Sequence, residues 1–223
     1  AVSAGSSPTL SDPSLPDPKD RIQMYELISE AIADSQRGRY DASIAKLQET
    51  FKIERDSLAV HYLLALNFYR KQDFPRAIEE LREVLRLRSD YPLAVYYLGL
   101  AYGKAGDWDQ AIAALERALA LDPTNFAAAL NLGAAYLRKG KVAESLAAFE
   151  RSVTIYPDYA QGHEALGEVL LYQGQVDHAI AALRKAVSLA PNDPKARRAL
   201  ARALQAKGLH QEAQEELRKL PPP

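Results

Sequence analysis

The chain repeats itself every 34 residues, and this period constrains its fold more than any other feature of the sequence. Residues 98–123 read LGLAYGKAGDWDQAIAALERALALDP, and residues 132–157 read LGAAYLRKGKVAESLAAFERSVTIYP. Rows of this length align without an insertion at about residues 24–57, 58–91, 92–125, 126–159, 160–193 and 194–220. Such a period predicts a repeat protein, in which each unit buries its apolar face against its neighbours.

Three columns of this alignment hold almost only glycine or small residues. They are Gly38, Gln72, Gly106, Gly140, Gly174 and Gly208; Ala31, Ala65, Gly99, Gly133, Gly167 and Ala201; and Ser43, Ala77, Ala111, Ser145, Ala179 and Ala213. The glycine column predicts the turn between two helices, because glycine adopts the left-handed conformation that ends a helix. Small side chains in the other two columns allow the helix backbones to approach each other closely.

The apolar residues of each row follow helical rather than strand spacing, as Ile112 and Leu119 show. Pro123, Pro157 and Pro191 close three rows, because proline prevents a helix from continuing. Each row is therefore predicted to be a helical hairpin. The expected helices are 22–36, 41–53, 58–71, 75–88, 92–105, 109–121, 126–139, 143–155, 160–173, 177–189, 194–207 and 210–219.

The repeated residues resemble the tetratricopeptide repeat over about residues 24–220. In two rows they are Leu98, Gly99, Tyr102, Ala111, Leu115, Ala118 and Pro123, and Leu132, Gly133, Tyr136, Ser145, Phe149, Ser152 and Pro157. The early tryptophan of the family is absent, and its column holds Leu27, His61, Val95, Ala129, His163 and Arg197. The resemblance implies an all-α fold, a right-handed α-solenoid of six helical hairpins. It also implies that the first helices line a concave groove and that the protein binds other proteins.

The first 20 residues differ in composition from the repeats. AVSAGSSPTLSDPSLPDPKD lacks an initiator Met and is rich in Pro, Ser and Asp, so residues 1–20 are expected to form a flexible tail or linker. Residues 21–223 are expected to form a single repeat domain. The stretch LPDPKDRIQMYE resembles bacterial linkers that join sulfatase domains of the alkaline phosphatase superfamily to such repeats. This similarity implies an alternative, a C-terminal accessory or oligomerisation module of a larger extracytoplasmic enzyme.

Composition argues against nucleic-acid binding and membrane insertion. Lys and Arg number 28 against 29 Asp and Glu, and no apolar run approaches the roughly 18–20 residues that span a bilayer. Because the chain has no cysteine, disulfides and thiolate chemistry are excluded. This composition is equally compatible with a soluble protein in the cytoplasm or in an exported compartment.

Side chains able to do chemistry are few and scattered. His61 and His163 share a column three rows apart, which in a stack of repeats places them too far apart for a common metal ion. We interpret both as partly buried packing residues. Asp107 and Asp109 are interpreted as the start of a helix, where the helix dipole favours acids. With no phosphate loop, HExxH, GxSxG or dinucleotide fingerprint, the sequence predicts no enzyme activity, no cofactor and no metal.

The inward face of the first helices is the candidate binding site. One column reads Tyr62, Tyr96, Leu130, Glu164 and Arg198, and the column one turn later reads Leu66, Leu100, Ala134, Glu168 and Arg202. The candidate peptide-binding groove comprises Tyr62, Leu66, Tyr69, Tyr96, Leu100, Lys104, Leu130, Asn131, Ala134, Arg138, Glu164 and Glu168. Tyrosine and leucine in such a face suit an extended or helical apolar segment of another protein.

Structural explanations of the same columns stay open. Tyrosine is common at this place in the family, where it packs against the neighbouring first helix. Glu164 and Glu168 stand opposite the two arginines of the next row, which favours an ion network between repeats over a charged ligand. Arg70, Lys104 and Arg138 lie at the ends of first helices, where cations complement the helix dipole. Self-association into a homo-oligomer is a further alternative.

Overall fold

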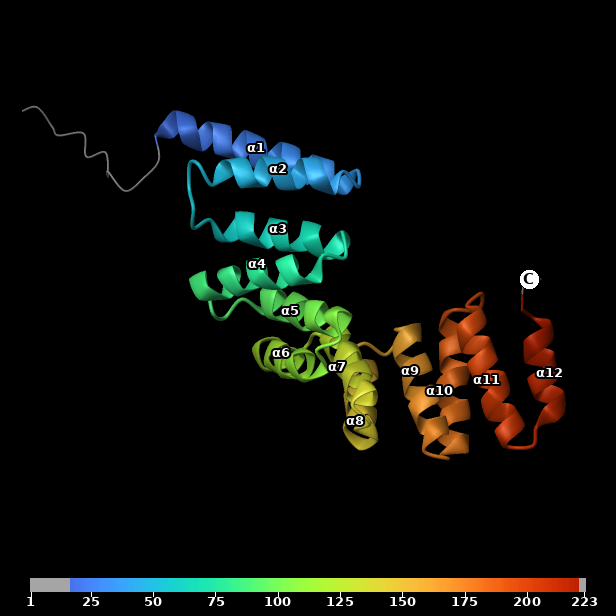
Figure 1. Cartoon of the computed structure of the whole chain (residues 1–223). Coiled ribbons are helices and arrows are strands. Elements are labelled where there is room, and N and C mark those ends of the chain that lie inside the picture. The colour runs from blue at the N-terminus through green and yellow to red at the C-terminus, as the bar shows by residue number, and fades with distance from the viewer. Residues whose placement is uncertain (1–16, 221–223) are drawn as a thin grey trace, which may run out of the picture. The chain divides into compact units, whose positions relative to one another are not determined.

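The structure is a computed structural model that describes residues 17–220, and within that range it contains twelve α-helices and no strand (Figure 1). It forms two compact units, one up to Ser89 and one from Asp90, and each is described by itself. Unit 1 contains α1 (Pro18–Gln36), α2 (Tyr40–Thr50), α3 (Leu58–Arg70) and α4 (Phe74–Leu87). Unit 2 contains α5 (Pro92–Ala105), α6 (Trp108–Leu121), α7 (Phe126–Arg138), α8 (Val142–Ile155), α9 (Ala160–Tyr172), α10 (Val176–Leu189), α11 (Pro194–Ala206) and α12 (His210–Arg218).

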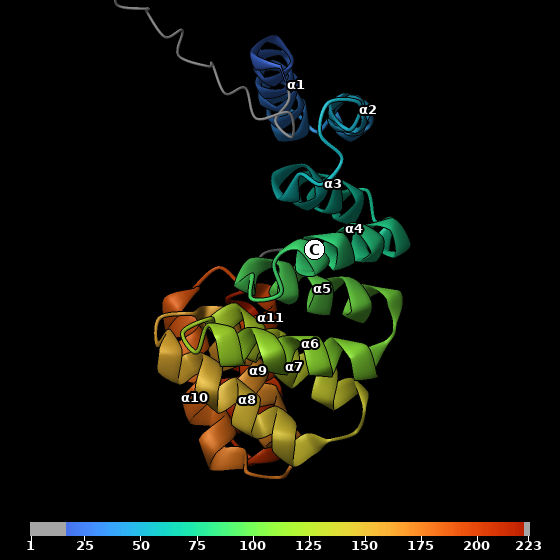
Figure 2. The same cartoon turned by 90° about the vertical axis from the view of Figure 1, so that its left-hand side faces the viewer.

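The helices pair into hairpins, as the repeat predicts, and a view turned by 90° shows the short loops that join them (Figure 2). In the second unit, α6, α8 and α10 each end two residues before the predicted stop at Pro123, Pro157 or Pro191. Contacts in this unit run from each helix to the next and between neighbouring first helices, α5 with α7 and α9 with α11. The sequence therefore predicts both the element type and the pairing.

Two helix ends differ from the prediction by more than one residue, for local reasons. α1 begins at Pro18 rather than at residue 22, because the carboxylate of Asp17 accepts a hydrogen bond from the amide of Lys19 at 2.8 Å and proline suits the first helical position. Residues 18–20 of the expected tail thus belong to a helix, and residues 1–16 lie outside the described range. α2 ends at Thr50 rather than at residue 53, because the amides of the next three residues donate hydrogen bonds to carbonyls three residues earlier in the chain instead of four.

The predicted turn column has left-handed backbone in all six rows. The five glycines have φ between 73° and 86°, and Gln72 adopts a φ of 62° in the same place. At Gly106, the following amide of Asp107 donates to the carbonyl of Tyr102 at 3.0 Å and closes the end of α5. Asp107 then caps α6 by accepting a hydrogen bond from the amide of Gln110 at 3.3 Å, as expected for an acid that starts a helix.

The small-residue columns lie where two helices of one hairpin touch. A Cβ atom added to Gly133 would lie 2.6 Å from the ring of Phe149, and one added to Gly167 would lie 2.4 Å from Cγ of Leu183. In the third column, Ala111, Ser145 and Ala179 are fully buried. Close approach of the helix backbones is therefore the physical reason for these columns.

The core of unit 1 is an apolar cluster with one buried acid beside it. The cluster consists of Ala31, Ile44, Leu47, Val60, Leu64, Phe68 and Ala77. Asp34 is only 5% exposed, and its carboxylate accepts hydrogen bonds from Nε of Arg39 at 2.9 Å and from Nζ of Lys46 at 2.9 Å. The hydrogen bond from Lys46, and next that from Arg39, lowers the pKa of Asp34.

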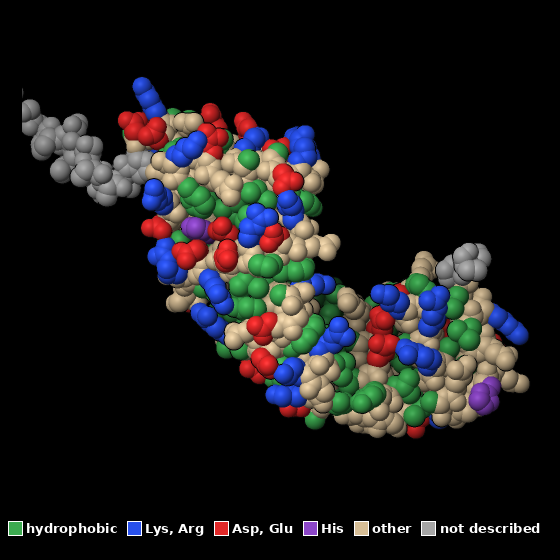
Figure 3. Space-filling model, viewed as in Figure 1, with side chains coloured by type: hydrophobic (Ala, Val, Ile, Leu, Met, Phe, Trp, Pro, Cys, Tyr) green, Lys and Arg blue, Asp and Glu red, His purple; other side chains and the backbone are tan. Residues whose placement is uncertain are grey.

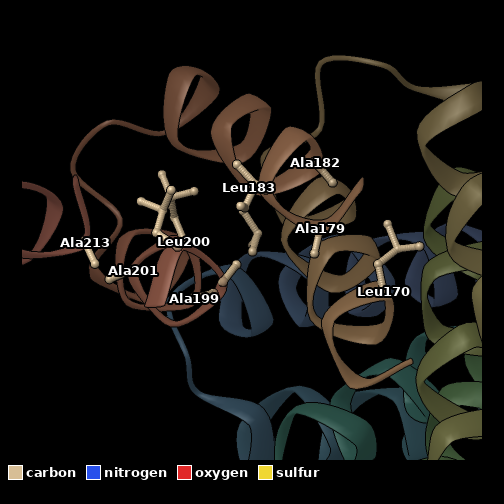
Figure 4. Close-up of a cluster of buried hydrophobic side chains, with 11 residues drawn as sticks. Leu170, Ala179, Ala182, Leu183, Ala199, Leu200, Ala201 and Ala213 are labelled. Carbon is tan, nitrogen blue, oxygen red and sulfur yellow. The ribbon is translucent and has the colours of Figure 1, made fainter. Parts of the chain in front are cut away.

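The core of unit 2 is built mainly from alanine and leucine. At its C-terminal end, Leu170, Leu183 and Leu200 pack against the alanines of α10, α11 and α12 (Figure 4). Alanine on the facing side lets the leucines interdigitate, so the α9–α10 and α11–α12 hairpins share one continuous apolar interior. α12 contributes only Ala213 as a buried residue, and its Leu217 is 39% exposed.

Candidate functional site

The predicted groove residues of unit 1 lie on one side of α3. Tyr62, Leu66 and Tyr69 follow helical spacing and are all partly buried. The ring of Tyr69 packs edge-on against Phe74, with ring centroids 5.7 Å apart. At the next residue, Nη1 of Arg70 donates to Oγ of Ser35 at 2.8 Å, and this hydrogen bond connects the end of α3 to α1. These side chains all belong to unit 1.

In unit 2, the first helices α5 and α7 contact each other, and polar and aromatic side chains lie at this contact. Tyr96 and Leu100 on α5 are partly buried, and Lys104 is exposed in the last turn of the helix. Nδ2 of Asn131 on α7 donates to the carbonyl of Ala127 at 2.8 Å and lies 3.5 Å from the hydroxyl of Tyr96. The structure thus brings Tyr96 and Asn131 together.

Leu130 is a correction to the predicted groove. Its side chain is 8% exposed and packs in a core cluster with Phe149 and Val169. A leucine is short enough to turn into the gap between α8 and α9, so it adds little to a binding surface. Elsewhere on α7, Ala134 is exposed, and the exposed Arg138 lies over the ring of Trp108 at 5.2 Å from its centroid.

Between α9 and α11, the described side chains form one ion pair rather than a network. Nη2 of Arg202 donates to Oε1 of Glu168 at 2.5 Å. Among the residues that the structure describes, neither Glu164 nor Arg198 forms an ion pair. Burial, and next the negative charges of Asp193 and Glu168, raises the pKa of Glu164. Red acidic and blue basic side chains accordingly lie next to each other over α9 and α11 (Figure 3).

An apolar cleft of about 350 Å³ lies beside this pair and was not predicted. Its walls are Leu137, Gly140 and Val142 of the α7–α8 hairpin and Glu168, Val169 and Tyr172 of α9. Tyr172 is 77% exposed and Leu137 is 37% exposed. Tyr172 continues the column of Arg70, Lys104 and Arg138, where a tyrosine replaces the cation. Extending that column by one row identifies Tyr172 from the sequence, although not the cleft around it.

A second cleft, of about 360 Å³, shares Glu168 with the apolar cleft. Gln161, Glu164, Asp193 and Lys195 complete its lining with Ala165, so three carboxylates face one ammonium group. The two clefts together give α9 an apolar end and an acidic end. Asp193 and Lys195 were missed because they lie at the start of α11, where Asp193 caps the helix by accepting from the amide of Lys195 at 2.8 Å.

Three further side chains that the sequence analysis considered for chemistry, His61, His163 and Asp109, contact neighbouring groups. His61 and His163 are partly buried, as expected of packing residues. Asp109 forms an ion pair with Lys139 at 2.9 Å. Within residues 17–220, no group of three or more His, Asp or Glu side chains is arranged to hold a metal ion, and no helix is long and apolar enough to cross a membrane.

Comparison with known families and structures agrees with the repeat pattern. Family profiles described as tetratricopeptide repeats match residues 66–106, 96–160 and 170–223. MamA from Desulfovibrio magneticus RS-1 is 26% identical, with a TM-score of 0.68 over 73% of this chain and 92% of that chain. PilF from Pseudomonas aeruginosa is 18% identical, with a TM-score of 0.77 over 89% and 90% of the two chains. YrrB, described as a TPR protein with an unusual peptide-binding site, is 19% identical, with a TM-score of 0.67 over 85% and 95%. No curated protein sequence matches the chain.

Proposed function

This chain belongs to the tetratricopeptide repeat family, and we propose that it is a non-catalytic scaffold that binds a segment of another protein on its first helices. The repeats of this family build protein-interaction scaffolds rather than enzymes. The finer question is which side chains hold the partner. Of the predicted groove residues, those on α5, α7 and α9 belong to one unit and are the basis of the proposal.

The observation that carries the proposal is the apolar cleft between Leu137 and Tyr172. A side chain as exposed as that of Tyr172 gains contacts only when a partner covers it, and its ring offers a large rigid face and one hydroxyl group. The acidic cleft that shares Glu168 adds a charge preference, because Glu164 forms no ion pair with a described residue. The partner segment would therefore insert an apolar side chain beside Tyr172 and place a basic side chain near Glu164.

The test uses a library of random 12-residue peptides, which reach about 40 Å in extended form. Selection on the full chain should enrich peptides that carry a large apolar residue followed by Lys or Arg. Replacing Tyr172 or Leu137 with Ser should weaken the binding of each enriched peptide about tenfold or more, because a buried apolar contact is lost. Replacing Glu164 with Gln should weaken the binding of peptides that carry a basic residue more than the binding of their uncharged variants.

The matched control is Leu217→Ser, which removes a leucine of nearly the same exposure, 39% against 37%, from α12. This variant should bind the enriched peptides as the unmodified chain does. Far-UV circular dichroism should show the same helical content for all variants. If the Tyr172 and Leu137 variants kept full affinity for the selected peptides, the cleft would not be the binding site.

The alternative from the sequence, an accessory or oligomerisation module of a larger enzyme, stays a hypothesis. Its specific consequence is self-association, since a module of that kind would join two copies of the parent protein. Light scattering of the 223-residue chain across a hundredfold range of concentration tests this directly. A constant monomer mass would remove oligomerisation, whereas a dimer that the Tyr172 variant disrupts would identify a second copy as the partner.

A further inference from the structure

In two repeats, a basic side chain of the first helix lies close to a glutamate of the second helix. In unit 1, Nδ1 of His61 on α3 lies 2.6 Å from Oε2 of Glu80 on α4. In unit 2, Nη1 of Arg197 on α11 donates to Oε2 of Glu216 on α12 at 2.6 Å. The two pairs occupy the same two columns of the 34-residue alignment, and their side chains are only 12–21% exposed. A partly buried carboxylate beside a basic side chain therefore occurs in two of these hairpins.

Repeat five carries only half of this pair. Its basic residue is His163, but the glutamate column holds Ala182. The imidazole keeps the same orientation as in the complete pairs, because its Nε2 donates to the carbonyl of Pro157 at 2.8 Å, as Nε of Arg197 does to Pro191 at 2.9 Å. Within residues 17–220, Nδ1 of His163 has no hydrogen-bond partner.

A cavity of about 420 Å³ lies between His163 and Ala182. Leu166 and Leu170 of α9 form its apolar wall together with Ala182 of α10. Figure 4 shows Leu170 and Ala182 on their neighbouring helices. This volume falls within the range of small-molecule sites, roughly 300–1,000 Å³. The missing glutamate therefore leaves a space large enough for a ligand, with apolar contacts on one side.

The charges around this cavity favour an anion. His163 of α9 and His178 and Lys185 of α10 supply three basic groups, and Glu150 of α8 supplies one carboxylate. Nζ of Lys185 lies 3.3 Å from Oδ1 of Asp158 and remains 45% exposed, so it can approach a second anion. When both imidazoles are protonated, three basic groups face the two carboxylates of Glu150 and Asp158, and a bound carboxylate reduces the repulsion among the basic groups.

We propose that this cavity binds a small carboxylate with an apolar body. The carboxylate takes the place that Glu80 and Glu216 hold in their own repeats and accepts a hydrogen bond from Nδ1 of His163. The apolar body packs against Leu166 and Leu170. This site lies between α8, α9 and α10 and shares no lining residue with the clefts of the proposed protein-binding face, so it extends the protein beyond a peptide scaffold.

Benzoate is a suitable probe, and benzamide is its uncharged counterpart. At about pH 6, where ordinary imidazoles are partly protonated, benzoate should shift the NMR signals of the His163 and His178 rings with a midpoint of about 1 mM. The rings of His61 and His210, which do not line the cavity, should keep their positions. Benzamide should bind at least about tenfold more weakly, because a neutral amide loses the charge-assisted hydrogen bond.

Two variants decide between a built site and a passive void. Ala182→Glu supplies the missing partner of His163 and should abolish benzoate binding without lowering the unfolding temperature. His163→Ala should weaken benzoate about tenfold, whereas His210→Ala, which removes an exposed histidine of α12, should change nothing. The Tyr172→Ser variant should also keep benzoate binding, which separates this site from the peptide-binding face. Equal binding of benzoate and benzamide, an unaffected Ala182→Glu variant, or no shift at about 10 mM benzoate would overturn the proposal.

Discussion

At the scale of single residues, Gln72 shows what the turn column demands. It adopts a φ of 62° where the other five rows have glycine. A side chain in this conformation is strained, because its Cβ approaches the following carbonyl oxygen. Replacing Gln72 with Gly should therefore stabilise the chain by about 0.5–1 kcal/mol in urea unfolding. Gln173→Gly is the matched control, because Gln173 has an ordinary φ of -78° and should lose stability instead. Stabilisation by both variants would contradict this explanation.

Gly133 tests the other small-residue column. An added Cβ would lie 2.6 Å from Cδ1 of Phe149, whose ring is 2% exposed and has little room to move. Gly133→Ala should lower the free energy of unfolding by about 1–3 kcal/mol. Gly103 provides the control, since its added Cβ would meet Trp108 at 3.4 Å, an ordinary contact. Gly103→Ala should be neutral or stabilising by up to about 1 kcal/mol, because alanine favours helix. Equal losses in both variants would show that helix spacing is not the constraint.

At the scale of elements, the hairpin of α1 and α2 depends on a buried carboxylate. Hydrogen bonds from Lys46 and Arg39 lower the pKa of Asp34 in the folded chain. A lowered pKa stabilises the fold at pH values above the pKa of aspartate in the unfolded chain, about 3.9. This contribution to stability disappears as the pH falls through the pKa of Asp34 in the folded chain.

The expected consequence is a loss of stability of unit 1 below about pH 4, which Asp34→Asn should largely remove. The measurement is the thermal unfolding midpoint of the unmodified chain and the variant between pH 7 and pH 3. Asp41→Asn serves as the control, because its carboxylate is 84% exposed in its pair with Lys71. Parallel pH profiles for the Asp34 variant and the unmodified chain would show that this carboxylate is not responsible.

The sequence predicts the helices and their pairing almost completely, because glycine, proline and small residues act locally or between neighbouring helices. It predicts the candidate site less well. Tyr96 and Leu130 occupy the same column, yet Leu130 turns into the core against Phe149 and Val169 while Tyr96 reaches Asn131. The column fixes the direction of the Cβ atom, but side-chain length and the neighbours from other helices decide exposure. Cavities arise from such combinations, so the apolar cleft required the structure.

At the scale of the whole molecule, the clearest feature is the one-dimensional order of contacts within unit 2. Each helix contacts the next helix, and the first helices α5 and α7, and α9 and α11, also contact each other. Stability in such a stack is approximately a sum of terms from each repeat and each interface between neighbours. Damage at one end should therefore stay near that end.

Leu200→Ala tests this locality. Leu200 is 3% exposed in the cluster shared by α9, α10, α11 and α12, and its truncation should cost about 2–5 kcal/mol there. Amide hydrogen exchange should accelerate in α10, α11 and α12, while the amides of α5 and α6, which do not contact these helices, keep their protection. Arg202→Ala, on the same helix but 61% exposed, is the control and should leave exchange in the core of α11 almost unchanged. If Leu200→Ala accelerated exchange equally from α5 to α12, unit 2 would unfold as one cooperative block, and the additive description of its repeats would be wrong.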